Sequence, residues 1–207
     1  DASRYREYDV VDRTFVPGGF DLPVAKTQVS WAGPDTLYVA TDFGPGSMTA
    51  SSYPRTVRVL HRGQGPVDAQ LYFEVPEDHM MGYVHHDQTP GFERDLAVDI
   101  IDFYDSITYL RKDGDWARID VPLDVNVDLH RQWLVMRPRT DWLVGETLHK
   151  AGSLLAADLE DFLAGSRNLR TLFTPEPTVS LQSWSWTRDY LLLNLLRDVS
   201  SEIQVLD

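Results

Sequence analysis

The chain contains no cysteine in its 207 residues, and this absence excludes several kinds of chemistry. Without cysteine there is no disulfide framework, no thiolate nucleophile and no cysteine-ligated metal site. The absence leaves the cellular compartment undecided, because neither an oxidising nor a reducing environment is required. We favour the cytoplasm, with the periplasm as the alternative.

Basic residues and long apolar runs are also scarce, which argues against nucleic acid and membrane as partners. The 19 Lys and Arg stand against 32 Asp and Glu, so the formal net charge is −13. Such a chain repels a phosphate backbone, and we predict no nucleic-acid partner. A membrane-spanning helix needs roughly 20 apolar residues. The longest apolar stretch, YLLLNLLRDV from Tyr190, is of strand length, so we predict no membrane partner.

Two catalytic motifs are missing as well. The loop TDFGPGS, which contains Gly44 and Gly46, has no lysine after it and leads into a strand, so it does not match a phosphate-binding loop. Glycine and proline there are typical of a long connection between strands. No G-x-S-x-G pentapeptide occurs, so we predict no catalytic residue in this chain. We also predict no cofactor.

The histidines give little support for a metal site. His85 and His86 are adjacent in a predicted strand, and adjacent strand residues point to opposite faces, so they cannot readily bind one ion. We predict no metal; one of the pair is expected between sheets and the other in water. His130 and His149 have no ligand-like spacing around them and are expected to be structural or solvated.

Strand signals dominate what is present. Short runs rich in Val, Ile, Leu, Tyr and Trp are separated by Gly, Pro, Asp and Asn. Examples are residues 36–43, 56–63, 69–76, 106–122, 133–139 and 190–198. Asp113-Gly114 predicts a two-residue hairpin turn, because both residues accept a positive φ. Only residues 155–165 look helical, with apolar residues on one face and Gly165 at the end.

A repeated unit predicts the fold. QVSWAGPDTLYV, VDLHRQWLVM and QSWSWTRDYLLL each combine a strand, a tight polar turn and a strongly apolar strand, and GYVHHDQTPGFERDLAVDI is a fourth copy. The apolar strands recur about every 50 residues, the size of a four-stranded propeller blade. We therefore predict an all-β fold of four-stranded antiparallel blades. Uneven spacing requires insertions.

The predicted domain organisation is a single β-propeller fragment over residues 1–207. An unpaired outer strand at residues 5–11 comes first, and blade repeats start near residues 24, 78, 123 and 178. The chain opens at Asp1 without a leader and stops at IQVLD before an outer strand, so we expect an excised piece. Open blade edges then make a homodimer possible. A ring closed at about four blades is the alternative.

Tryptophan could supply either packing or sugar binding. Trp31, Trp133 and Trp186 occupy equivalent ends of strands in the repeats. Large aromatic rings fill the wedge-shaped spaces between twisted sheets, so we expect these three to pack between blades. Paired acids such as Asp99 and Asp102 are expected by chance in so acidic a chain, and a propeller glycosidase is a third hypothesis.

Four longer strings carry a family resemblance. FVPGGFDLPVAKTQVSW, DTLYVATDFGPGSMTASSYPR, TPGFERD and SWTRDYLLLNLL are similar, in this order, to segments of one family. They resemble the N-terminal propeller domain of the prolyl oligopeptidase family of serine peptidases, particularly its bacterial members. The resemblance runs over nearly the whole chain.

The resemblance implies a seven-bladed propeller that caps an α/β-hydrolase domain with a Ser-Asp-His triad. This chain would supply about four blades, and its partners would be the missing hydrolase domain and the peptide substrates of the parent. In the family the propeller admits short peptides, which are cleaved after proline, and excludes folded proteins. The loop with Asp42, Gly44, Gly46 and Arg55 is then a candidate structural or interface loop, with Asp42 and Arg55 as its anchors. A self-standing small propeller that acts as a binding or scaffold module is the alternative function.

Overall fold

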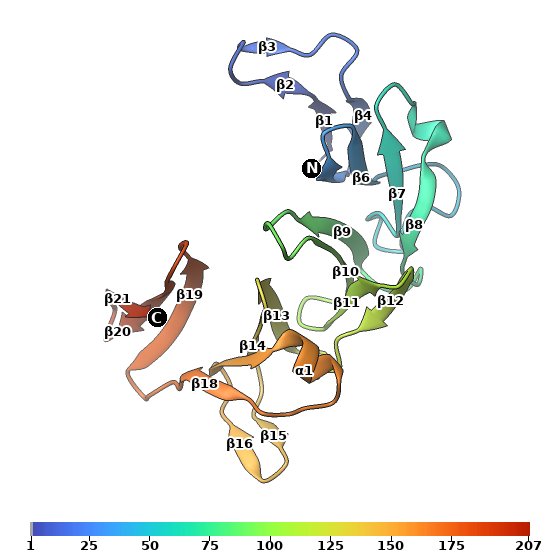
Figure 1. Ribbon diagram of the computed structural model, residues 1–207. Helices are drawn as coiled ribbons and strands as arrows, with labels where there is room; N and C mark the ends of the chain where they lie inside the picture. Colours follow the sequence, from blue (N-terminus) through green and yellow to red (C-terminus); the bar gives the residue numbers. More distant parts are fainter. Residues whose placement is uncertain (1) are drawn as a thin grey trace. The chain divides into compact units, whose positions relative to one another are not determined.

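The computed structural model describes residues 2–207, and in this part of the chain it is almost entirely β-structure (Figure 1). The chain divides into two compact units, Asp1–Ile119 and Asp120–Asp207. The described residues include one α-helix, α1 (Leu159–Leu163), which is far too short to cross a bilayer. All strand pairings are antiparallel, so the predicted all-β class is confirmed.

The first unit contains two four-stranded sheets and two small ones. The strands of the first large sheet are, in order, β5 (Gln28–Gly33), β6 (Thr36–Ala40), β7 (Thr56–His61) and β8 (Gln70–Glu74). Those of the second are β12 (Asp115–Arg118), β11 (Ser106–Lys112), β10 (Arg94–Ile100) and β9 (Met81–Asp87). The small sheets pair β1 (Ser3–Arg6) with β4 (Asp21–Ala25) and β2 (Tyr8–Asp9) with β3 (Thr14–Phe15). A 3-10 turn, η1 (Pro66–Asp68), precedes β8.

Strand β6 is buried on both faces from Leu37 to Ala40, which explains the continuous apolar run at these positions. Because side chains alternate along a strand, Leu37 and Val39 lie on one face, where they join a core cluster with Leu22 of β4. Tyr38 and Ala40 lie on the other face, in a cluster that includes Val84 of β9 and Ala97 of β10. The two large sheets of this unit therefore pack face to face, as successive propeller blades do.

The second unit repeats this arrangement. One sheet has the order β13 (Val125–His130), β14 (Trp133–Pro138), β17 (Leu154–Asp158) and β18 (Arg170–Phe173), and the next has β19 (Val179–Trp186), β20 (Leu191–Arg197) and β21 (Ser200–Leu206). A shared apolar core joins Val135 and Leu154 of the first sheet to Leu181 and Leu193 of the second. The hairpin β15 (Trp142–Val144) and β16 (Thr147–His149) is inserted between β14 and β17.

Two local predictions need correction and one is confirmed. Asp113 and Gly114 have φ values of 51° and 89° and close the β11–β12 hairpin as predicted. The predicted helix at residues 155–165 is wrong over its first part, because Ala156 and Ala157 pair with β14 and the helix begins at Leu159. Residues 5–11 are not an unpaired strand, because β1 pairs with β4 and β2 with β3.

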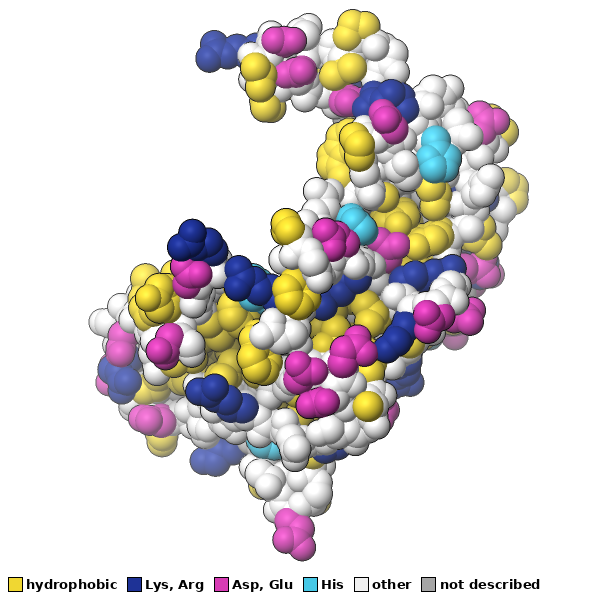
Figure 2. Space-filling model, viewed as in Figure 1, with side chains coloured by type: hydrophobic (Ala, Val, Ile, Leu, Met, Phe, Trp, Pro, Cys, Tyr) yellow, Lys and Arg dark blue, Asp and Glu magenta, His cyan; other side chains and the backbone are white. Residues whose placement is uncertain are grey.

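Charged side chains are mixed over the visible surface. Figure 2 shows acidic and basic groups interspersed with apolar ones and not separated into patches of one sign. This pattern is typical of a solvated surface and fits the scattered acids of the sequence.

Candidate functional site

The loop between β6 and β7 contains the four residues singled out in the sequence. The Asp42 carboxylate accepts hydrogen bonds from the Gly44 amide at 2.9 Å and the Ser47 hydroxyl at 3.3 Å, which closes a tight turn. Gly44 and Gly46 have φ values of 102° and 80°, in the region that favours glycine. The local sequence thus fixes a specific loop conformation.

Arg55 ties this loop to the edge of its own sheet. Its Nε donates to the Val75 carbonyl at 2.9 Å, and its Nη1 donates to the Gly46 carbonyl at 3.1 Å. Its Nη2 lies 3.0 Å from a carboxylate oxygen of Glu74, and only 19% of the side chain is exposed. Arg55 and Gly46 are therefore in direct contact, whereas Asp42 acts within the neighbouring turn. The role of this loop at an interface stays a prediction.

The same loop also reaches the next sheet. The Ala50 amide donates to the Glu77 carbonyl at 2.8 Å, and the Thr49 hydroxyl donates to the Met80 carbonyl at 2.9 Å. The Gly82 amide of β9 donates to the Pro54 carbonyl at 3.0 Å. Residues 42–55 therefore bridge the two large sheets of the first unit, and we call this segment the bridging loop.

A polar cluster on Asp95 joins these two sheets a second time. Tyr38 and Tyr72 both donate to its Oδ2, at 2.7 and 2.6 Å, and His86 Nδ1 lies 2.7 Å from its Oδ1. Burial above all, together with hydrogen bonding to Asp95, raises the pKa of both phenols, so both remain protonated donors. His85 instead lies beside the Tyr83 ring.

The sequence did not reveal the Asp95 cluster. Pairing of β9 with β10 places His86 opposite Asp95, and this part could have been found from the strand register. The two tyrosines come from the other sheet, and no local pattern signals a contact between sheets. A second pair, His79 and Asp99, lies 2.8 Å apart, and burial raises the pKa of Asp99.

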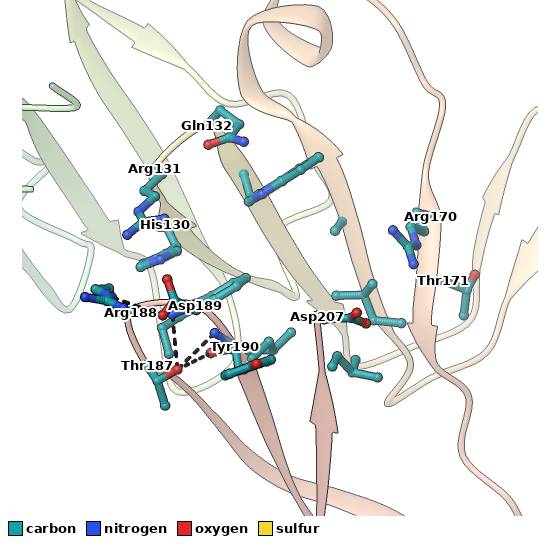
Figure 3. A pocket seen from close by; sticks show the side chains of 16 residues that line it. His130, Arg131, Gln132, Arg170, Thr171, Thr187, Arg188, Asp189, Tyr190 and Asp207 are labelled. Carbon is teal, nitrogen blue, oxygen red and sulfur yellow. Dashed lines mark hydrogen bonds and ion pairs between the residues drawn. The ribbon is translucent and has the colours of Figure 1, made fainter.

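The second unit has a cavity of about 310 Å³ between its two sheets. Figure 3 shows His130, Arg131 and Arg188 on one side and Arg170 on the other, with Tyr190 and Asp207 between them. Four of its lining residues are aliphatic, and we call them the apolar floor of the cavity: Ala156, Leu172, Leu191 and Leu206. The β13–β14 and β19–β20 turns, which the sequence repeat places at equivalent positions, form one rim.

Aromatic rings line much of this cavity. His130 and Trp186 stack with centroids 4.2 Å apart and planes 8° from parallel. Trp133 and Tyr190 are 40% and 50% exposed and also line the cavity. The expectation that the repeat tryptophans pack between sheets is right for Trp186, which packs on the core. Trp133 lines the cavity between the two sheets, and Trp31, which is 43% exposed, lies edge-on to the buried Phe20 ring with centroids 5.7 Å apart.

Charged side chains of both signs line the cavity, three basic and two acidic. Arg131, Arg170 and Arg188 face two acids, Asp189 and Asp207. Arg188 is paired with Asp189 at 3.0 Å. No hydrogen bond or ion pair holds the guanidinium groups of Arg131 and Arg170 within residues 2–207. In a chain of net charge −13, Arg131 and Arg170 are therefore two guanidinium groups at the cavity that an anion can contact.

Face-to-face packing of antiparallel sheets within each unit, three of them four-stranded and one three-stranded among the described residues, defines the chain as part of a β-propeller. The comparisons with known proteins agree. No family model matches the chain. It is 27% identical over its full length to an uncharacterized peptidase, y4nA, of Sinorhizobium fredii, and 25% identical over 96% of its length to an uncharacterized peptidase of Rickettsia prowazekii. In each case it covers 30% of the relative.

Two solved structures show the same fold. A post-proline cleaving enzyme from Rickettsia typhi matches 99% of the chain with a TM-score of 0.89 and 24% identity, over 32% of that enzyme. A structure from a study of two prolyl endopeptidases matches 96% of the chain with a TM-score of 0.68 and 15% identity, over 29% of its length. The resemblance stated from the sequence is confirmed: the chain is a partial match to peptidases of the prolyl oligopeptidase family.

Proposed function

We propose that this chain is the part of the propeller that controls access in a serine peptidase of the prolyl oligopeptidase family. The parent cleaves short peptides after proline, with catalytic residues outside this chain. The observation that carries the proposal is the match of the whole chain to about a third of a post-proline cleaving enzyme. The two relatives named as peptidases support the same assignment.

The contacts between sheets suit a propeller that limits access. A cap that admits peptides by size must keep neighbouring blades together, because a gap between blades would admit larger chains. In the first unit the bridging loop and the Asp95 cluster both fasten one sheet to the next. Directional hydrogen bonds at two places fix the spacing of the sheets more narrowly than apolar packing alone.

We extend the proposal to the domain and its partners. The four large sheets are consecutive blades of one propeller domain, and the bridging loop lies near the face that meets the hydrolase domain. Strand β21 has one hydrogen-bonded neighbour, β20, among the described strands. Its other edge is therefore able to pair with a second copy when the chain is studied on its own. Sizing of the isolated chain tests this, and a monodisperse monomer contradicts it.

A labelling experiment tests the assignment of catalysis. The complete reading frame that contains this chain and the 207-residue chain alone are each treated with a serine-directed fluorophosphonate. The complete protein is expected to be labelled and to hydrolyse a short chromogenic peptide with proline before the scissile bond, but not the matched peptide with lysine there. Labelling of this chain alone, or an unlabelled complete protein, contradicts the proposal. The latter result favours a binding or scaffold propeller.

A further inference from the structure

We propose that the cavity of the second unit binds the carboxyl end of a short peptide whose last residue is proline. This inference rests on the proposed function, because cleavage after proline releases such peptides. Its basis is the combination of exposed aromatic rings, an apolar floor and unpaired arginines in one hollow. The site would retain a product at a distance from the reaction.

The rings of the cavity suit a prolyl side chain. Proline is rigid and lacks an amide hydrogen, and proline-rich peptides commonly dock in grooves lined by aromatic rings. Trp133 and Tyr190 keep 40% and 50% of their surface exposed, and the stack of His130 on Trp186 keeps these two rings in place beside them. The apolar floor can accept the ring carbons without leaving a polar group unpaired.

The arginines suit the terminal carboxylate. Arg131 and Arg170 lie at the cavity without an ion-pair partner in the described part of the chain, so no existing pair has to break when an anion binds. A guanidinium group can donate two parallel hydrogen bonds to one carboxylate. Asp189 and Asp207 also line the cavity, and they disfavour a ligand with a second negative charge nearby.

The size of the cavity selects the end of a peptide and not its middle. Its volume of about 310 Å³ is at the lower limit of the ~300–1,000 Å³ typical of ligand pockets. One or two residues fill such a space, and the remaining peptide extends into solvent. A free carboxylate next to a prolyl ring occurs only at the end of a chain, so this chemistry separates products from uncleaved substrates.

Calorimetry on the complete protein tests binding independently of catalysis. The reactive serine is first blocked with a fluorophosphonate, and three probes are compared: the tripeptide Ala-Ala-Pro, its C-terminal amide, and Ala-Ala-Ala. We expect Ala-Ala-Pro to bind at least about tenfold more tightly than its amide, because a charge-assisted contact is lost. We also expect it to bind more tightly than Ala-Ala-Ala. Equal binding of all three probes, or no binding, overturns the proposal.

Matched variants separate this cavity from the catalytic centre. Arg170→Gln is expected to weaken Ala-Ala-Pro binding about tenfold. The control Arg197→Gln makes the same change of charge on a solvent-exposed residue of the same unit, and it is expected to leave binding unchanged. Thermal melting confirms that both variants are folded. Binding insensitive to Arg170→Gln shows that the peptide occupies another site and overturns the proposal. If peptide hydrolysis is absent but these binding results hold, the proposed function fails while the cavity assignment stands.

Discussion

Replacement of Arg55 by alanine gives the sharpest test of the bridging loop. The change removes two hydrogen bonds from a charged donor to backbone carbonyls and one ion pair with Glu74. A hydrogen bond that involves a charged group contributes ~1.5–3 kcal/mol, and coupled losses are not additive. We therefore expect the free energy of unfolding to fall by about 2–4 kcal/mol. For a chain of this size the melting temperature would drop by roughly 5–12 °C.

Glu74→Gln is the matched control. It removes the ion pair with Arg55 but keeps both bonds to carbonyl oxygens, and Glu74 is 46% exposed. An exposed ion pair is worth ~0–1 kcal/mol, so this variant should melt within about 3 °C of the wild type. Hydrogen exchange should show faster exchange of the Ser47 and Thr49 amides in Arg55→Ala alone. The reasoning is refuted if Arg55→Ala and Glu74→Gln melt at the same temperature.

Three further predictions concern the first unit. Gly82→Ala should lower the free energy of unfolding by about 1–3 kcal/mol, because a Cβ there would lie 2.8 Å from Val75 Cγ1. In the control Gly33→Ala the new Cβ meets open space, so thermal or urea unfolding should be nearly unchanged. Equal effects of the two substitutions contradict this prediction. Burial alone would raise the pKa of Asp87, but hydrogen bonds and a neighbouring guanidinium lower it, so its stabilisation is present at neutral pH and lost below about pH 4. The stability difference between wild type and Asp87→Asn should thus shrink between pH 7 and pH 3, and a constant difference counts against it. Tyr72→Phe should lower the free energy of unfolding in urea by about 1.5–3 kcal/mol, because the hydrogen bond from the phenol to the Asp95 carboxylate is lost. A decrease of less than ~0.5 kcal/mol contradicts this prediction.

Much of the fold was predictable because its main signals are local. The apolar strand β6, the Asp113-Gly114 turn and the repeated strand–turn–strand units depend on alternation and turn chemistry, which a short window of sequence contains. The start of the helix was predicted too far toward the N-terminus, because it is set by a contact between strands and not by a local signal. Residues 155–158 have a helix-like apolar pattern, but pairing with β14 makes Leu154–Asp158 a strand, and Asp158 then caps the shortened helix.

The candidate sites were less predictable, because they depend on contacts between sheets. The partners of Arg55 at Val75 and Glu74 are about 20 residues away along the chain, and the tyrosines of the Asp95 cluster come from a different sheet. The cavity of the second unit unites turns that are more than 50 residues apart in sequence. The repeat showed that these turns are equivalent, but not that a hollow lies between them.

The dependence of cleavage on substrate length tests the central claim most directly. The complete protein is given peptides of about 8, 20 and 60 residues that share one proline-containing cleavage sequence, and kcat/KM is measured for each. If the propeller restricts access by size, kcat/KM falls steeply with length. Arg55→Ala, which weakens the bridging loop between two sheets, then restores part of the cleavage of the longest peptide. Equal kcat/KM values for all three lengths in the wild-type protein would contradict the account.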